Sequence, residues 1–176
     1  MNRRCYTVIF LLIVISIAGC GKKEHPKDAI LIDNFNVHRA EFEELLQMFQ
    51  ADRSLGRVGD GFTRTASFFE ECTGPNAWNG KEIEVTKERL AAYEQLFIKL
   101  GLRQGIEGYC EKSVVTFIAS TKGLSVTGTA KGYAYYVNPP QLIVDDLDAY
   151  WSPDRRSFTA YRHIDGKWYL FFNYED

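Results

Sequence analysis

The apolar positions in residues 36–52 follow the period of an α-helix. Four of them stand at positions i, i+3, i+4 and i+7 and therefore share one helix face: Phe42, Leu45, Leu46 and Phe49. Asn36 is a preferred N-cap residue, so we expect the helix to begin there and to end near Asp52. Glu43 follows Arg39 by four residues, which predicts an ion pair on the exposed face of the helix.

The same period returns in residues 86–101. Thr86 is a preferred N-cap residue, and Val85 and Leu90 stand at the two positions of a hydrophobic staple. The predicted buried face consists of Leu90, Tyr93, Leu96, Phe97 and Leu100. We expect the helix to end at Gly101, because glycine readily takes the left-handed conformation of a Schellman motif.

From Ser113 onward the period changes to two, which indicates β-strands. Residues 113–120 form a β-branched run, residues 121–123 are predicted to turn the chain, and residues 124–127 are predicted to return it. Residues 133–137 form a further predicted strand.

The clearest predicted hairpin lies at the end of the chain. Asp165 and Gly166 separate two β-rich runs, residues 157–164 and 167–174, and Asp-Gly is a preferred two-residue hairpin turn. With that turn, one face carries Tyr161, His163, Trp168, Leu170 and Phe172. The other face carries Phe158, Arg162, Tyr169 and Phe171. Because both faces include apolar side chains, we expect this hairpin to be central in its sheet or covered on both sides.

These elements predict an α+β fold, with two helices packed on an antiparallel β-sheet that ends in a C-terminal β-hairpin. Residues 53–82, between the predicted helices, contain several glycines and are predicted to be irregular. Connections of that length often carry function.

The first 20 residues have a different pattern. Arg3 and Arg4 precede an almost unbroken apolar run at residues 8–17. This run suits the apolar core of a signal peptide and is shorter than the about 20 residues that span a bilayer. Residues 17–20 (IAGC) resemble the lipobox of bacterial lipoproteins, which is an aliphatic residue, two small residues and a cysteine. The alternatives are an uncleaved membrane helix and an ordinary signal peptide.

The lipoprotein resemblance implies that Cys20 becomes the mature N-terminus and attaches the protein to a membrane through acyl chains. Several acyl chains on one residue suffice for stable anchoring. Gly21 follows Cys20 where an Asp commonly signals retention in the inner membrane, so the resemblance favours the outer membrane, facing the periplasm. A Gram-positive host or surface display stays open.

The predicted organisation is a lipoprotein signal peptide at residues 1–19, a lipidated N-terminus and tether at residues 20–32, and a single periplasmic domain at residues 33–176. The tether is charged and contains Pro26. Removal of the signal peptide takes away Arg3 and Arg4 and leaves 19 Lys and Arg against 23 Asp and Glu. An acidic domain in this compartment argues against a nucleic-acid partner.

Two cysteines remain after the signal peptide and the lipidated residue are set aside. Cys72 and Cys110 form a single pair in an oxidising compartment, which predicts a disulfide bond. The alternatives are a two-thiol metal site and a redox pair, but the wide spacing of the cysteines lacks the C-x-x-C signature of either.

Sequence motifs for catalysis or metal binding are mostly absent. There is no H-E-x-x-H, and residues 123–128 miss G-x-S-x-G by one position. His163 is a candidate general base or ligand, although a histidine in a strand more often packs against an aromatic neighbour. The acidic residues Asp145, Asp146 and Asp148 could hold calcium, but they lack EF-hand spacing. We therefore expect no metal and no cofactor.

Aromatic residues are dense after residue 133, and Tyr and Trp favour interfaces because each joins an apolar body to a polar tip. We expect an exposed binding surface among Tyr135, Trp151, Tyr161, His163, Trp168 and Tyr169.

The leading functional hypothesis is a lipid-anchored, non-enzymatic binding module near the membrane, with an envelope protein or the cell wall as its partner. The second is a periplasmic inhibitor or immunity protein that caps a toxic enzyme, by analogy with small acidic lipoproteins. The third is an envelope hydrolase that uses His163 with an acid such as Asp145.

Overall fold

The computed structural model describes residues 24–69, 71–73, 77–110, 112–124, 127–150 and 157–176. The predicted signal peptide, Cys20 and Trp151 lie outside these residues. Within the described ranges, no helix has both the length and the apolar composition needed to cross a membrane.

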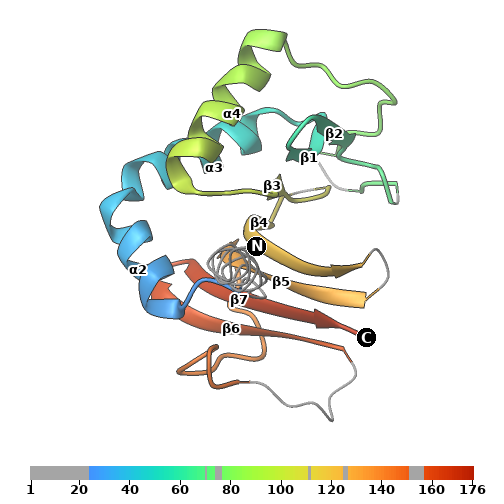
Figure 1. Cartoon of the computed structure of the whole chain (residues 1–176). Helices are drawn as coiled ribbons and strands as arrows, with labels where there is room; N and C mark the ends of the chain where they lie inside the picture. Colours follow the sequence, from blue (N-terminus) through green and yellow to red (C-terminus); the bar gives the residue numbers. More distant parts are fainter. Residues whose placement is uncertain (1–23, 70, 74–76, 111, 125–126, 151–156) are drawn as a thin grey trace, which may run out of the picture.

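Seven strands form one antiparallel sheet in the order β2-β1-β3-β4-β5-β7-β6 (Figure 1). The strands are β1 (Leu55–Gly59), β2 (Phe62–Thr65), β3 (Gly105–Glu107), β4 (Val114–Leu124), β5 (Thr127–Tyr136), β6 (Phe158–Asp165) and β7 (Trp168–Glu175). The α+β class, the antiparallel sheet and the C-terminal hairpin are therefore confirmed.

The described part of the chain has three helices where two were predicted: α2 (Asp28–Val37), α3 (Arg39–Ala51) and α4 (Lys87–Leu100). The additional helix, α2, begins inside the predicted tether, and its Leu31 and Phe35 are buried. The folded domain therefore starts before residue 33, and the predicted tether at residues 20–32 is too long.

Helix α4 begins and ends as the sequence predicts. Thr86 is the N-cap, and its hydroxyl accepts a hydrogen bond from the backbone N–H of Arg89 at 3.2 Å. Gly101 takes the left-handed conformation with φ +69°, and the N–H of Leu102 donates to the carbonyl of Phe97 at 2.9 Å. Both ends are determined by residues close in sequence, so local rules suffice.

The C-terminal end of α3 is neutralised by two cationic side chains. The ammonium of Lys112 donates to the carbonyls of Phe49 and Asp52, the latter at 2.7 Å. Arg89 donates to the carbonyl of Met48 at 3.2 Å. Positive charge is favourable at this end because the last carbonyls of a helix have no intrahelical partner. Burial of Lys112 lowers the pKa of its ammonium to about 8.

The main core lies between the helices and one face of the sheet. Its centre is an aromatic group made by Phe35, Phe42, Phe117, Tyr133 and Trp168. The indole N–H of Trp168 donates to the carboxylate of Glu43 at 2.8 Å, which satisfies a polar group inside this core. The predicted ion pair between Arg39 and Glu43 is therefore wrong, and Arg39 instead pairs with Asp165.

The other face of the sheet has no helix residue in its apolar cluster. This cluster consists of Ile118, Ala134 and Phe171, with Ala130, Tyr136 and Tyr161 packed against it. Figure 1 shows the helices running along one side of the sheet. We call the face that carries Ile118, Ala134 and Phe171 the open face.

The C-terminal hairpin has a different register from the predicted one. Trp168 lies opposite Asp165 and Tyr169 lies opposite His163, with an irregularity between His163 and Asp165. A one-residue shift moves side chains to the other face of a sheet. Tyr161 and His163 therefore share the open face with Tyr169, and Trp168 enters the core.

The predicted turn at residues 121–123 is also wrong, because β4 continues to Leu124 and pairs with β5 throughout. In residues 53–82, predicted to be irregular, the chain forms the hairpin of β1 and β2. Asp60 and Gly61 separate these two strands, and Gly61 has φ +74°. Such a backbone conformation favours glycine.

A buried ionic network fixes the N-terminal segment to the sheet. The carboxylate of Asp28 contacts Lys131 at 2.7 Å and Arg162 at 3.0 Å, and it accepts the backbone N–H of Leu147 at 2.9 Å. Asp148 contacts Lys131 at 2.6 Å and accepts the backbone N–H of Asp28 at 3.0 Å. Asp148 thereby caps the N-terminus of α2 from a distant part of the chain.

Candidate interaction surface on the open face of the sheet

One row of directly opposed residues crosses the open face through all seven strands. In sheet order, its members are Arg64, Arg57, Glu107, Thr116, Ala134, Tyr169 and His163. Directly opposed residues project from the same face, so the row connects a charged end at β2 with an aromatic end at β6.

At the charged end, Arg64 lies among three phenylalanine rings. Its guanidinium carbon is 4.7 Å from the ring centre of Phe68, 5.8 Å from that of Phe62 and 5.9 Å from that of Phe69. Phe68 is 52% exposed and Phe69 is 67% exposed. Together with Arg57 and Tyr109, these residues form what we call the Arg–aromatic cluster.

Arg57 and Arg64 lie directly opposite each other, and like charges in that position repel. Arg57 is compensated by Glu107, whose carboxylate is 3.0 Å from its guanidinium, and it lies over the ring of Phe62 at 5.2 Å. Among the residues that the structure describes, no carboxylate lies within ion-pair distance of Arg64. The guanidinium of Arg64 is therefore stabilised by cation–π contacts with aromatic rings rather than by an ion pair.

The predicted disulfide between Cys72 and Cys110 is present in the structure. It lies beside the Arg–aromatic cluster. The N–H of Cys110 donates to the carbonyl of Ala66 at 3.3 Å, just before the two exposed phenylalanines in the chain. The adjacent Tyr109 packs edge to face on Phe69 at 4.9 Å. The disulfide thus ties the segment that carries the phenylalanines to the end of β3.

Tyr109 is part of the same electrostatic environment. Burial raises the pKa of its phenol, and the negative charge of Glu107 raises this pKa further. The two arginines of the cluster act in the opposite direction. Tyr109 therefore stays a neutral phenol at physiological pH, with its ring available for packing.

At the other end of the open face, Tyr136 and Tyr161 contact each other. Their hydroxyl oxygens are 2.5 Å apart, and their rings meet edge to face with centres 5.1 Å apart. Burial, followed by the hydrogen bond to Tyr136, raises the pKa of Tyr161. A cavity of about 440 Å³ adjoins the pair and is lined by Tyr136, Pro139, Pro140, Gln141, Leu142, Thr159 and Tyr161.

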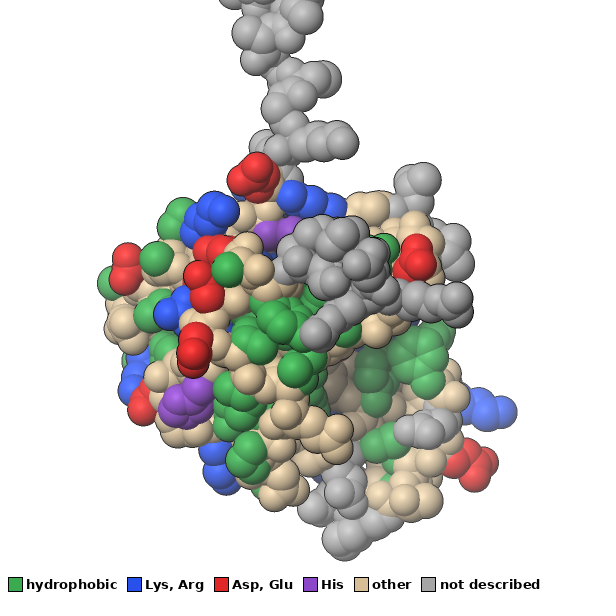
Figure 2. All heavy atoms as spheres, turned by 90° about the horizontal axis from the view of Figure 1, so that it is seen from below, with side chains coloured by type: hydrophobic (Ala, Val, Ile, Leu, Met, Phe, Trp, Pro, Cys, Tyr) green, Lys and Arg blue, Asp and Glu red, His purple; other side chains and the backbone are tan. Residues whose placement is uncertain are grey.

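Figure 2 shows the side of the molecule seen from below β6. Hydrophobic side chains gather at its centre, and charged side chains lie toward its edge. The segment at residues 142–144 lies along β6 here, since Ile143 pairs with Tyr161 in a parallel bridge. This short pairing covers part of an otherwise free sheet edge.

The predicted binding surface is brought together only in part. Trp168 and Tyr169 are 2% and 5% exposed, so neither lines an exposed surface. Tyr135 is half-buried and lies edge to face against Trp168 on the helix-covered side. Tyr161 and His163 do lie on the open face, and Trp151 is outside the described residues.

His163 is exposed and packs against the ring of Tyr169 at 5.2 Å. Its Nε2 lies 3.2 Å from the carbonyl oxygen of Gly166. In the described part of the chain, no hydrogen bond or ion pair joins His163 to a carboxylate, Asp145 included. The arrangement therefore lacks an acid that would orient this imidazole as a general base.

Carboxylates of Asp28, Asp146 and Asp148 come within 4.8 Å of one another, whereas Asp145 is not part of this group. Their oxygens contact the cations Lys131 and Arg162 and several backbone N–H groups. Two acids of the network thus face two basic side chains, which balances their charge within the protein.

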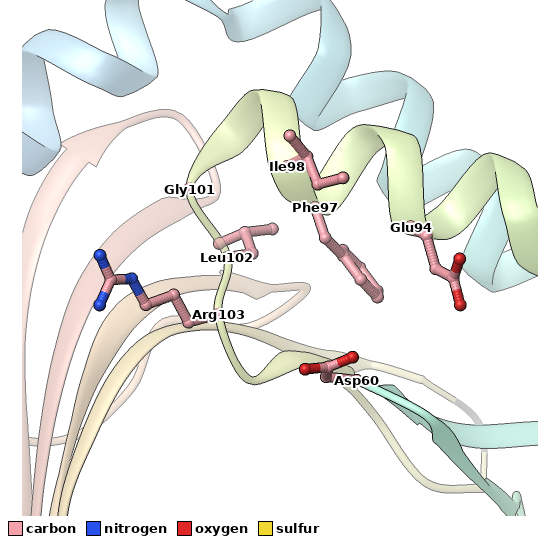
Figure 3. A pocket seen from close by; sticks show the side chains of 7 residues that line it. All are labelled: Asp60, Glu94, Phe97, Ile98, Gly101, Leu102 and Arg103. Atoms are coloured by element: carbon pink, nitrogen blue, oxygen red, sulfur yellow. The ribbon is translucent and has the colours of Figure 1, made fainter.

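A second hollow lies between α4 and the hairpin of β1 and β2. It has a volume of about 480 Å³ and is lined by Asp60, Glu94, Phe97, Ile98, Gly101, Leu102 and Arg103. Figure 3 shows Phe97 and Leu102 directed into it, and Arg103 directed away from it. Asp60 and Glu94 stand on its two sides, at the strand turn and on the helix.

No protein-family model, curated protein or solved structure matches this chain. The candidate surface therefore depends on geometry alone. Sequence reasoning missed the Arg–aromatic cluster, although one signal was present. Asp60 and Gly61 separate two short β-rich runs, as Asp165 and Gly166 do, and the same turn preference would have predicted this hairpin.

Proposed function

We propose that the chain is a non-enzymatic binding protein of the bacterial cell envelope. It is attached to the outer membrane through acyl chains on Cys20, and it binds another envelope protein through the Arg–aromatic cluster. The observation that carries the proposal is the exposure of Phe68 and Phe69 beside Arg64, in a segment that the disulfide ties to the end of β3.

The composition of the cluster favours a protein partner. Arginine and aromatic side chains are enriched at the centres of protein interfaces, where they contribute a large part of the binding energy. Arg64 is oriented by the rings around it and has no described acid within ion-pair distance. A partner that places a carboxylate beside Arg64 would balance the charge of its guanidinium, because a guanidinium binds a carboxylate through two parallel hydrogen bonds.

The position of the cluster agrees with membrane attachment. The N-terminal segment packs on the helix-covered face, where His25 meets Phe172 edge to face at 5.7 Å. Arg57 and Arg64 project from the open face. Attachment at the N-terminus therefore leaves the cluster on the opposite side of the sheet from the anchor.

The test is site-specific photo-cross-linking of the full chain in the bacterial envelope. We expect a photoreactive residue at Phe68 to yield one specific protein adduct. The matched control is the same residue at Ile98, which is 83% exposed on α4. The adduct from Phe68 should disappear in a chain that also carries Arg64→Glu, since this change repels an acidic partner.

Equal adducts from both positions, or an adduct that survives Arg64→Glu, would contradict a protein site at this cluster. Acylation is tested separately by mass spectrometry of the mature protein and of Cys20→Ala. Inhibition of the cross-linked partner by the purified chain would identify the inhibitor or immunity role within the same proposal. Retention on peptidoglycan without any protein adduct would identify a cell-wall partner instead.

A further inference from the structure

We propose that a polar pocket beside the N-terminal segment binds the phosphate-bearing head group of an anionic phospholipid in the anchoring membrane. This inference rests on the acylation of Cys20 in the proposed function. We call this hollow the anchor-side pocket, and it is lined by Glu24, Pro26, Gly101, Arg103, Gln104, Ala119, Ser120, Thr121 and Lys122.

The chain length between the anchor and the pocket places them close together. Glu24 follows Cys20 by four positions, and an extended chain spans at most about 3.6 Å per residue. The backbone of Glu24 therefore lies within about 14 Å of the backbone of Cys20. Because Glu24 itself lines the anchor-side pocket, the pocket lies within reach of the lipid head groups.

The N-terminal segment is fixed to the domain beside the pocket, so the pocket lies on the side from which the chain leaves for the anchor. The ring nitrogens of His25 lie 2.6 Å from the hydroxyl of Ser120 and 2.7 Å from that of Thr129. Three residues later, Asp28 enters the buried network with Lys131 and Arg162. The short link from Cys20 thus sets which side of the domain faces the bilayer.

The pocket is lined by two basic side chains, Arg103 and Lys122, and by one acid, Glu24. Among the described residues, no carboxylate lies within ion-pair distance of Arg103 or Lys122. Figure 3 shows that Arg103 extends away from the apolar hollow between α4 and β1. The hydroxyl of Thr121 adds a hydrogen-bond donor to the lining, whereas that of Ser120 contacts His25. Arginine and hydroxyl groups are well suited to phosphate oxygens.

The linker that precedes the domain is also basic in sequence. The linker contributes Lys22, Lys23 and Lys27 in sequence, against the single acid Glu24. Basic residues next to a membrane attachment point are attracted to anionic lipids. Within the domain, the pKa of His25 falls to about 4 through burial first and then through the charges of Lys122 and Lys131.

The size of the pocket fits such a ligand. Its volume is about 550 Å³, within the range of about 300–1,000 Å³ that is usual for small-molecule sites. A glycerophosphate head group fills part of that space, and its acyl chains remain in the bilayer. The pocket therefore needs no lipid extraction, only contact of the domain with the membrane surface.

The test uses the full acylated protein reconstituted into vesicles. One set consists of phosphatidylcholine alone, and the other contains phosphatidylglycerol as well. We expect amide hydrogen exchange in residues 101–104 and 119–122 to slow in the anionic vesicles relative to the neutral ones. The double variant Arg103→Gln, Lys122→Gln should lose this slowing. One basic side chain strengthens binding to an anionic surface about fivefold. The double variant should therefore weaken binding of the head group about 25-fold.

The control is a double variant with the same change in charge at another exposed site, Lys81→Gln with Lys87→Gln, which should keep the slowing. Equal exchange in both vesicle types, or slowing that survives Arg103→Gln with Lys122→Gln, would overturn the proposal. Slowing produced by inorganic phosphate without vesicles would assign the pocket to soluble phosphates and would overturn it too. Mass spectrometry first verifies the acyl chains, so a missing anchor is distinguished from a missing head-group site.

Discussion

At the scale of single residues, the informative side chains are buried charges that lie far apart in the sequence. The sequence predicts that Asp28 lies in a tether, because its neighbours are charged and lack apolar periodicity. In the structure it is buried and contacts both Lys131 and Arg162. No local pattern predicts such a contact, because the partners of Asp28 come from strands more than 100 residues later in the chain.

We expect Asp28→Asn to destabilise the domain by about 3–5 kcal/mol, because the change leaves Lys131 buried with one acid fewer. Denaturant unfolding of the two proteins measures the difference. Asp33→Asn is the matched control, since Asp33 is exposed on the same helix, α2. A similar small loss in both variants would show that the network adds little to stability.

His25 predicts a pH dependence with a definite sign. Its folded pKa of about 4 lies below the ordinary value of 6.5, so the unfolded chain binds an additional proton between these two pH values. The contribution of His25 to stability is therefore complete above about pH 6.5 and is lost as pH falls toward 4. Because the ring is only half-buried, we expect about 2 kcal/mol over this range.

The measurement is the free energy of unfolding as a function of pH for the wild type and for His25→Gln. The two curves should run parallel above pH 6.5, and they should converge as pH falls toward 4. Curves that stay parallel down to pH 4 would refute a depressed pKa for this histidine.

At the scale of elements, prediction succeeded where both ends of an element are set by neighbouring residues. Helix α4 has its own cap at Thr86 and its own terminator at Gly101. Local rules miss helix α2 because its N-cap residue, Lys27, makes no side-chain cap, and the N–H of Asp28 donates instead to the distant Asp148. The register of the last hairpin was missed because an irregularity before Asp165 is needed to direct Trp168 into the core.

For α4, the local cap supports a direct prediction. We expect Thr86→Ala to reduce the stability of the domain by about 1 kcal/mol, because the first turn then loses the hydroxyl that accepts from Arg89. Thermal or denaturant unfolding measures the change. Thr86→Ser keeps the hydroxyl and should stay within a few tenths of a kcal/mol of the wild type. Equal losses in the two variants would mean that the cap is not the cause.

At the scale of the whole molecule, composition and hydrophobic period suffice to predict the class of fold, but they do not predict which aromatic residues are exposed. The aromatic residues after residue 133 were expected to supply the exposed site, yet Trp168 and Tyr169 are buried in the sheet. The exposed aromatics Phe68 and Phe69 come from residues predicted to be irregular. Exposure depends on which face of a sheet receives helices, and that is a property of the assembled fold.

The disulfide lets this surface be tested through stability. We expect Cys72→Ser with Cys110→Ser to cost about 4 kcal/mol, since the bond closes a loop with a sequence separation of 38 residues. Hydrogen exchange should also accelerate in residues 66–69, next to Phe68 and Phe69. Helix α4 serves as the internal reference, because its caps do not involve either cysteine. Unchanged exchange at residues 66–69 would show that the cluster does not need the covalent bond.

The network around Asp28 also constrains how the chain is made. A ribosome releases α2 long before it releases Arg162, which is 134 residues further along, and Asp148 arrives nearly as late. Helix α2 thus has neither its cap nor its ionic partners during most of synthesis, and its apolar residues Leu31 and Phe35 await β5 and β7. Contacts of such long sequence separation form slowly. Assembly of this domain is therefore completed only after β7 has left the ribosome, and the nascent chain must be kept from aggregating until then.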